Sequence, residues 1–122
     1  MKVLLSIKPE FANKIFDGTK KYEFRKSIFK RNDVKTVVVY ASSPMQQVIG
    51  EFEIVEILYM EVELLWKITH PFAGINKNFY DEYFANKEMA FAIQVGEVRK
   101  FSKPKRLSDY DFDYAPQSFA YL

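Results

Sequence analysis

Cysteine is absent from this chain of 122 residues, and histidine occurs once, as His70. Without cysteine the chain has no disulfide bonds, no thiolate metal ligands and no cysteine nucleophile. A single histidine excludes a histidine-rich metal centre, and a Ser-His-Asp triad would have to use this one residue. Because His70 stands before Pro71 at the expected end of a helix, we predict a capping role for it. We therefore expect neither a metal site nor a cofactor.

Long hydrophobic runs are also absent. The amino-terminal stretch is interrupted by Ser6 and Lys8 before an apolar segment of the length of a signal sequence or membrane span develops. We expect a strand in a cytoplasmic protein that makes no membrane contact. The length allows one hydrophobic core and is too short for two ordinary domains, so we predict a single domain over residues 1–122.

Net charge is small, with 18 basic and 16 acidic residues giving +2, but the charge is unevenly distributed. Residues 20–35 hold seven basic and two acidic side chains, and residues 99–106 hold five basic and no acidic ones. Such patches suit a nucleic-acid backbone. They also occur as solvated lysines that keep a protein soluble and block the pairing of edge strands. Both interpretations are open.

Aromatic residues are abundant, with 12 phenylalanines and 8 tyrosines in a total of 17%. They can fill a compact core or offer stacking surfaces to bases, and we expect the core to take most of them. Trp66, Phe79 and Tyr83 have helical spacing, which predicts core positions rather than base platforms.

Strand and helix periodicities follow one another irregularly along the chain. The patterns predict strands over residues 1–8, 20–26, 36–41, 47–60 and 89–98, and helices over 9–17, 61–69 and 76–85. Gly50 indicates a bulge or a close backbone approach within the longest early strand. Because strands and helices do not alternate regularly, we predict an α+β fold with a mostly antiparallel, closed sheet. The aromatic tail, residues 116–122, is expected to dock onto the fold.

Residues 18–25 read Gly-Thr-Lys-Lys-Tyr-Glu-Phe-Arg, which is G-x-K-x-x-E-x-R directly after a helix that begins beside Ser6-Ile7-Lys8-Pro9. This pattern resembles the ASCH domain family of the PUA-like superfamily. Three further stretches look like the small single-domain members of that family: Val39–Pro44, Val48–Glu51 and Ala115–Ser118. The resemblance covers essentially the whole chain. It implies a small PUA-like β-barrel with flanking helices and a charged cleft, and RNA binding in RNA metabolism or in the regulation of transcription or translation.

The residues of the motif can also be considered without the family. Glu23 and Arg25 are two positions apart on one strand, so they share a face and can form a salt bridge. The same pair suits a nucleobase or a phosphate, since guanidinium donates to paired acceptors and carboxylate accepts from an amine. Lys20 is a solvated surface charge, a phosphate contact or, if desolvated, a proton donor or base.

Ser42 and Ser43 stand where a buried strand runs into Pro44. They offer hydroxyl and backbone N–H groups to a phosphate, or they only form a polar turn. The predicted site for RNA or a nucleotide-like ligand comprises six residues: Lys8, Lys20, Glu23, Arg25, Ser42 and Ser43.

Catalysis is the alternative to plain binding. Some ASCH relatives are amidohydrolases of N4-acylated cytosine nucleosides, such as N4-acetylcytidine, and use the motif lysine, a threonine and a later glutamate. That resemblance implies Lys20, Glu23 in place of the threonine, and Glu51 as the catalytic set. The threonine hydroxyl is then missing, although Thr19 is near and a carboxylate can activate water. A ribonuclease would instead use Glu23 and Lys20 as base and acid near a 2′-hydroxyl. A protein adaptor is the third class.

Overall fold

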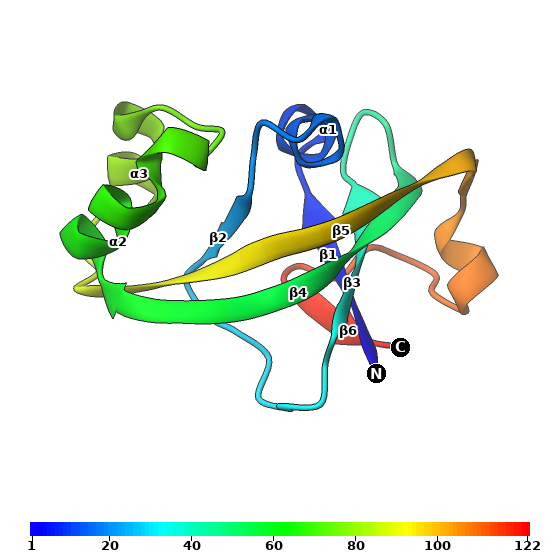
Figure 1. Cartoon of the computed structure of the whole chain (residues 1–122). Coiled ribbons are helices and arrows are strands. Elements are labelled where there is room, and N and C mark those ends of the chain that lie inside the picture. The colour runs from blue at the N-terminus through cyan, green and yellow to red at the C-terminus, as the bar shows by residue number, and fades with distance from the viewer.

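The computed structural model describes residues 1–122 and contains one six-stranded sheet with short helices around it (Figure 1). The elements in chain order are β1 (Lys2–Ile7), α1 (Pro9–Asp17), β2 (Tyr22–Arg25), β3 (Thr36–Ala41), β4 (Gln47–Glu61), α2 (Val62–Thr69), the 3-10 helix η1 (His70–Phe72), α3 (Lys77–Tyr83), β5 (Met89–Lys105), the 3-10 helix η2 (Leu107–Tyr110) and β6 (Phe119–Tyr121). None of the helices is long and apolar enough to cross a membrane.

Most predicted elements are present with the expected type. The clearest difference is β5, which runs on to Lys105, so the basic stretch 99–106 lies almost wholly within this strand instead of after it. The other difference is β6 in the tail. With three residues, this strand is too short to show an alternating pattern in the sequence. The tail does dock, since β6 pairs with β1.

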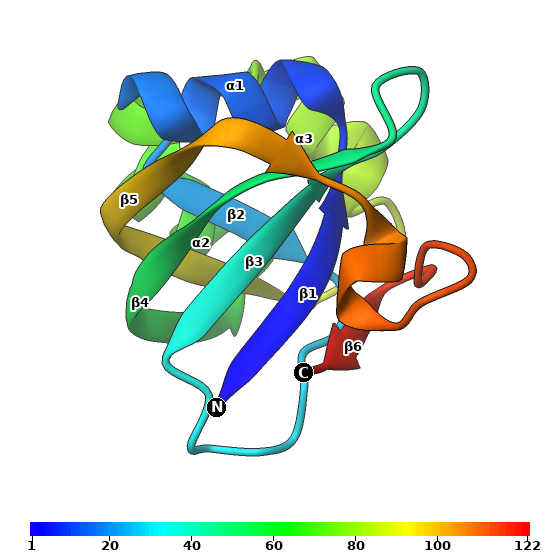
Figure 2. The ribbon, with the colours of Figure 1, turned by 90° about the vertical axis from the view of Figure 1, so that its right-hand side faces the viewer.

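The strands lie in the order β2-β5-β4-β3-β1-β6. Only β1 and β3 are parallel, so the sheet is mostly antiparallel and the α+β class is confirmed. The sheet curls strongly, as Figure 2 shows, into a half-barrel that resembles a PUA-like barrel. It is not hydrogen-bonded into a closed ring, because β2 and β6 are its two edges. The expectation of a closed sheet is therefore corrected, and a seam remains between β2 at one edge and the paired strands β1 and β6 at the other.

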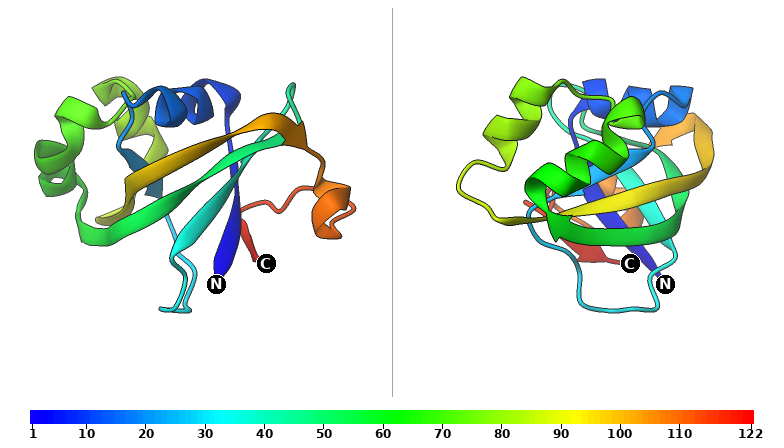
Figure 3. Two further views of the ribbon diagram at one scale, coloured as in Figure 1. Left: turned by 45° about the vertical axis from the view of Figure 1, so that its right-hand side comes forward. Right: turned by 60° about the vertical axis from the view of Figure 1, so that its left-hand side comes forward.

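Bulges account for much of the curvature. The pairing of β4 with β5 shifts register three times, including once beside Gly50. A Cβ atom on Gly50 would lie 2.6 Å from the carbonyl oxygen of Arg99 and 2.6 Å from the Phe16 ring. Both readings of this glycine, bulge and close approach, are thus confirmed. The long β4–β5 hairpin carries α2 and α3 at one end, while the segment with η2 follows its other end (Figure 3).

Hydrophobic side chains cover both faces of the sheet. The inner face of the half-barrel holds the largest cluster, with Val3, Leu5 and Ile7 of β1 packed against β3, β4 and α1. Leu4 points to the outer face, where the segment that contains η2 covers it. A separate cluster around Tyr80 fixes α2 and α3 against the sheet. This last cluster holds α3 beside β2, and so positions one wall of a cleft.

Candidate functional site

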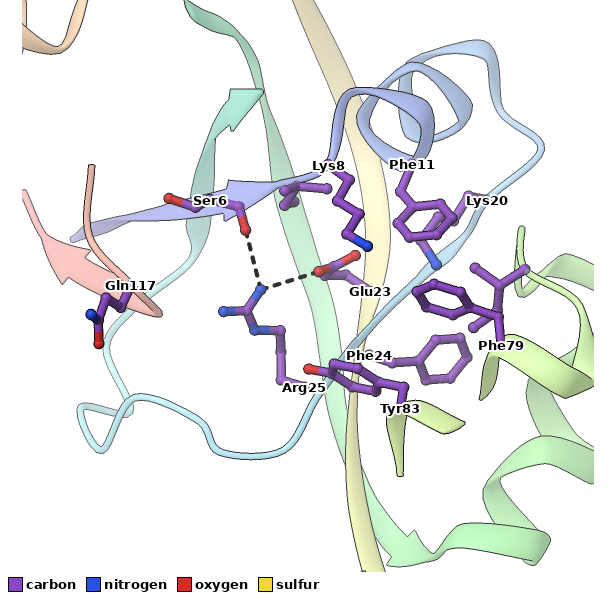
Figure 4. A pocket seen from close by; sticks show the side chains of 12 residues that line it. Ser6, Lys8, Phe11, Lys20, Glu23, Phe24, Arg25, Phe79, Tyr83 and Gln117 are labelled. Carbon is purple, nitrogen blue, oxygen red and sulfur yellow. Dashed lines mark hydrogen bonds and ion pairs between the residues drawn. The ribbon is translucent and has the colours of Figure 1, made fainter. Parts of the chain in front are cut away.

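A cleft of about 380 Å³ opens at the seam of the half-barrel, between β2, the start of α1 and α3 (Figure 4). Its polar lining comprises Ser6, Lys8, Lys20, Glu23, Arg25 and Gln117. Its apolar lining includes the rings of Phe11, Phe24, Phe79 and Tyr83. The whole motif Lys20, Glu23 and Arg25 therefore enters one cavity, in which charge and aromatic surface are combined.

The pleat of β2 places the charged side chains. Glu23 pairs with Ile93 and Arg25 with Phe91 of β5, so both charged residues share the inner face with Ile93. Phe24 lies between them on the other face of the strand and packs in the cluster under α3, where its ring borders the cleft beside Lys20. Because β2 has β5 as its only neighbour, its free edge faces the seam. The predicted alternation of this segment is confirmed.

Arg25 bridges the seam. Its Nη1 donates to Glu23 Oε2 at 3.3 Å and to the Ser6 carbonyl at 3.4 Å. Its Nη2 donates to the Ser118 carbonyl at 3.0 Å and to Ser118 Oγ at 3.4 Å. The guanidinium thereby connects β2 to β1 and to the residues before β6, and no strand pairing joins β2 to either of them. Arg25 thus supports the cleft as well as lining it.

Glu23 is only 6% exposed, and its two oxygens differ. Oε2 accepts from Arg25, whereas Oε1 has no donor within the protein. Every fully buried side-chain oxygen and nitrogen has a hydrogen-bond partner, so this free oxygen is open to the cleft. A carboxylate oxygen in this position accepts a hydrogen bond, or a proton, from whatever enters.

Lys20 is 2% exposed, which makes it a buried lysine and not a solvated surface charge. Its Nζ donates to the Ala73 carbonyl at 2.7 Å and lies 4.9 Å from the centre of the Phe24 ring. Burial lowers the pKa of Lys20 to about 8, with Glu23 opposing the shift and Lys14 adding to it. An ammonium has three N–H donors. Only one of them has an acceptor in the protein.

Two further lysines stand over the aromatic walls. Lys8 Nζ lies 5.3 Å from the centre of the Phe79 ring, and Lys26 Nζ lies 4.8 Å from that of Tyr83. Burial raises the pKa of the Tyr83 hydroxyl, so it stays protonated as a donor. The prediction that Phe79 and Tyr83 are core residues is only partly confirmed, because both are half-buried and line the cleft, while Tyr83 also packs against the core cluster around Tyr80. Trp66 does pack against that core, as predicted.

Three predicted residues lie outside the cleft. Ser42 and Ser43 form part of the turn after β3, where the Ser42 N–H donates to the Ile7 carbonyl at 2.9 Å. Glu51 pairs with Val38, which belongs to the outer-face cluster, so it stands on the opposite face from Glu23. There it forms ion pairs with Lys2 and Arg99. The structure does not bring Lys20, Glu23 and Glu51 together.

Several residues of the cleft were not predicted from the sequence. Phe11, Ile75 and Gln117 line the cleft, and Ser118 holds Arg25. Ser118 belongs to the stretch Ala115–Ser118, which resembles the family, so the resemblance was the one available signal for it. Periodicity cannot show that a tail residue meets β2. His70 is exposed at the end of α2 and lies outside the cleft. No three His, Asp or Glu side chains lie close enough together to hold a metal ion.

Comparison with known proteins adds three similarities. The family described as ASCH domain matches residues 5–99. The crystal structure of ASCH from Zymomonas mobilis has a TM-score of 0.91 at 28% identity, covering 99% of this chain and 87% of that chain. A relative from the same organism, named ASCH domain-containing ribonuclease, is 32% identical over 90 residues, which are 74% of this chain and 61% of that protein.

A longer relative contains a similar stretch. The large ribosomal subunit protein uL22 of Ureaplasma parvum is 30% identical over 120 residues, which cover 98% of this chain. The chain spans only 39% of the length of that protein. In that relative, therefore, a stretch similar to this chain is one part of a larger polypeptide.

Proposed function

The chain belongs to the ASCH domain family, and we propose that its cleft binds single-stranded RNA by holding one nucleotide. Lys20, Glu23 and Arg25 are the polar contacts in this proposal, and the rings of Phe79 and Tyr83 are the stacking surfaces. Proteins that recognise RNA by sequence favour unpaired nucleotides, whose bases can stack on aromatic side chains and expose their hydrogen-bonding edges. The cleft volume of about 380 Å³ suits a single nucleotide rather than a duplex.

One observation supports this function most strongly: an unused acceptor and unused donors are held in the same aromatic cavity. Glu23 Oε1 has no donor, and two of the three Lys20 N–H groups have no acceptor. Buried polar groups are normally paired within a protein, because leaving one unpaired is costly. A nucleobase edge presents both donors and acceptors, so it provides a donor for Glu23 Oε1 and an acceptor for Lys20 at the same time.

Basic side chains around the cleft favour a phosphate-bearing ligand over a free base. Lys8 and Lys26 stand beside the aromatic walls, with Nζ 5.3 Å from the centre of the Phe79 ring and 4.8 Å from that of Tyr83. Positive charge at this position attracts the phosphates that flank the bound nucleotide. RNA is favoured over DNA by the similarity to a protein named as a ribonuclease.

Ribonuclease activity is the second candidate, and the Glu23–Lys20 arrangement favours it. In this reaction Glu23 Oε1 takes the proton of the 2′-hydroxyl, and the 2′-oxygen attacks the phosphorus. Lys20 gives a proton to the departing 5′-oxygen as the P–O5′ bond breaks. The products are a 2′,3′-cyclic phosphate and a free 5′-hydroxyl. A lysine with a pKa of about 8 is a better proton donor than an ordinary lysine.

The amidohydrolase of N4-acetylcytidine has less support. Its catalytic set would need Glu51 beside Lys20, and Glu51 is held on the other face by Lys2 and Arg99. Both oxygens of Glu51 are used in these ion pairs. The hydroxyl nucleophile at the position of Glu23 is also missing.

A titration tests the binding function. Labelled single-stranded and duplex RNAs are titrated at two salt concentrations with the wild-type protein, Glu23→Gln and the matched control Glu51→Gln. We expect single-stranded RNA to bind more tightly at low salt and Glu23→Gln to weaken it about tenfold, which is ~1.4 kcal/mol. Glu51→Gln should bind like the wild type. Equal binding by all three proteins would overturn the proposal.

Reaction products separate the catalytic candidates. The same RNAs are incubated with the protein in EDTA, and the ends of any fragments are identified by mass spectrometry. Fragments with 2′,3′-cyclic phosphate that Glu23→Gln abolishes would establish the ribonuclease. Release of acetate from N4-acetylcytidine, without RNA binding, would replace both proposals with the hydrolase.

A further inference from the structure

The short segment Phe72–Gly74 lies directly behind Lys20. Its three consecutive carbonyl oxygens each accept one hydrogen bond from α1 or the loop after it: Phe72 from the Lys21 N–H at 2.8 Å, Ala73 from Lys20 Nζ at 2.7 Å and Gly74 from Lys14 Nζ at 3.1 Å. The segment therefore accepts hydrogen bonds from the Lys20 ammonium and from the backbone of the next residue, Lys21. The hydrogen bond from Lys14 fixes the segment itself. No other acceptor in the protein contacts Lys20 Nζ.

Gly74 meets the stem of the Lys20 side chain. Its φ is +70°, a left-handed conformation that glycine adopts without strain. A Cβ atom at this position would lie 2.5 Å from Lys20 Cβ and 2.6 Å from Lys20 Cγ. These atoms are next to the backbone and cannot swing away as the end of the side chain could. Any larger residue at position 74 must therefore displace Lys20.

Aromatic rings flank the ammonium end of the side chain. Lys20 Nζ lies 4.9 Å from the ring centre of Phe24 and 5.4 Å from that of Phe11. A free lysine has a flexible four-carbon stem and loses rotamer entropy when it is fixed. Fixing it before a ligand arrives removes this loss from the binding step.

We propose that Phe72–Gly74 is a clamp that orients Lys20 toward the cleft, and that Gly74 and Lys14 are positioning residues of the RNA-binding site. The identity of the ligand rests on the proposed function above. The orientation of Lys20, in contrast, is a property of the free protein and can be measured without RNA.

Gly74→Ala is the main test, and Gly18→Ala is its matched control. Gly18 also has a left-handed backbone, with φ of +90°, but nothing lies within 4 Å of a Cβ placed there. Both substitutions introduce the same methyl group at a left-handed position, and only the one at position 74 collides with Lys20. Differences between the two variants therefore report the contact and not the backbone strain.

Two measurements are made on each variant. The titration of Lys20 is followed by NMR on protein labelled with ¹³C at lysine, and RNA affinity is measured by fluorescence anisotropy. In the wild type and in Gly18→Ala we expect Lys20 to titrate near pH 8. In Gly74→Ala the midpoint should rise toward that of an ordinary lysine, because the displaced ammonium regains water. RNA affinity should fall about tenfold in this variant, which corresponds to ~1.4 kcal/mol.

Substitutions of Lys14 test the clamp if Gly74→Ala fails to fold. Lys14→Met removes the hydrogen bond to the Gly74 carbonyl together with the charge, whereas Lys14→Gln removes the charge and keeps an N–H donor. We expect weaker RNA binding and a more mobile Lys20 side chain in Lys14→Met than in Lys14→Gln. Equal behaviour of the two variants would contradict the clamp.

The outcomes separate this inference from the proposed function. If the Lys20 titration responds to Gly74→Ala but the wild type binds no RNA, the clamp stands and the RNA proposal fails. If RNA binds in the wild type and Gly74→Ala matches Gly18→Ala in both measurements, the clamp is overturned and RNA binding stands.

Discussion

Two groups of charged residues occupy opposite faces of the same sheet. The cleft contains Lys20, Glu23 and Arg25, whereas the outer face carries an ion-pair network of Lys2, Glu51, Arg99 and Glu53. In the network both oxygens of Glu51 are paired, with Lys2 at 2.9 Å and with Arg99 at 3.1 Å. In the cleft one oxygen of Glu23 and two donors of Lys20 have no partner.

The two groups also differ in the burial of their cations. Lys2 and Arg99 have side chains that are 52% and 39% exposed, whereas Arg25 and Glu23 are 12% and 8% exposed. The accessible cations thus belong to the better-paired group, although the Glu51 side chain is as buried as that of Arg25, at 12% exposed. Exposed pairs add little to stability, and buried unpaired groups reduce it. Glu23 is largely buried but keeps one oxygen open to the cleft and without a donor, which is why we propose that the function lies in the cleft.

Arg25→Ala should have the largest effect. This substitution removes the donors that join β2 to Ser6 and Ser118 and leaves Glu23 as an unpaired buried charge. We expect a loss of about 3 to 5 kcal/mol in the free energy of unfolding, measured by urea denaturation. Arg99→Ala on the outer face is the control, and its loss should be much smaller. Equal losses would remove the distinction between the two groups.

Lys20→Met should separate binding from stability. Methionine fills similar space without charge, so RNA affinity falls about tenfold while the free energy of unfolding rises by about 1 to 3 kcal/mol. The gain follows from the lowered pKa of Lys20, which shows that burial opposes its charge. Anisotropy and urea denaturation give the two values. A destabilised variant would show that Lys20 is a structural residue.

The pH dependence of the wild type should show opposite trends for binding and stability. Because Lys20 has a pKa of about 8 when folded and 10.5 as an ordinary lysine, the unfolded chain binds more protons between these values. The free energy of unfolding therefore rises with pH across this window. Binding of a non-cleavable 2′-O-methyl RNA should fall over the same range as the charge is lost. Lys20→Met should show neither trend. If the wild type and Lys20→Met change with pH in the same way, the pH dependence belongs to groups other than Lys20.

Glu51→Gln should have the smallest effect. The hydrogen bonds and charges of Lys2 and Arg99 hold the pKa of Glu51 below its ordinary value of 4.5. A carboxylate with a lowered pKa stabilises the fold above the ordinary value, and this contribution is lost as the pH falls. We expect less than about 1 kcal/mol at neutral pH, and a difference from the wild type that shrinks below pH 4.5. An effect on RNA binding would contradict the assignment of Glu51 to the outer face.

Local sequence predicted much of the fold. Helix α1 follows from Pro9 at its start and Gly18 at its end, and β3 has the predicted bounds Thr36–Ala41. The alternation in β2 correctly placed Glu23 and Arg25 on one face, opposite Phe24. These features depend on short-range geometry, in which a residue and its near neighbours fix the conformation.

The site was only partly predictable. The family resemblance pointed to Lys20, Glu23 and Arg25, and all three line one cleft. It also pointed to Glu51, which the pleat of β4 directs to the outer face. Helical spacing grouped Phe79 and Tyr83 on one face of a helix, but it did not show whether that face meets the core or a cavity. That choice depends on how α3 docks against the sheet.

The sequence by itself determined the types of most elements, the charged face of β2 and the family. Tertiary structure alone decided that the sheet stays open at the β2 edge, that Arg25 spans the gap, and that Phe72–Gly74 lies behind Lys20. The physical reason is the range of the interactions. Periodicity, capping and turns act over a few residues, whereas the bond from Lys20 to Ala73 joins positions 53 apart and that from Arg25 to Ser118 joins positions 93 apart.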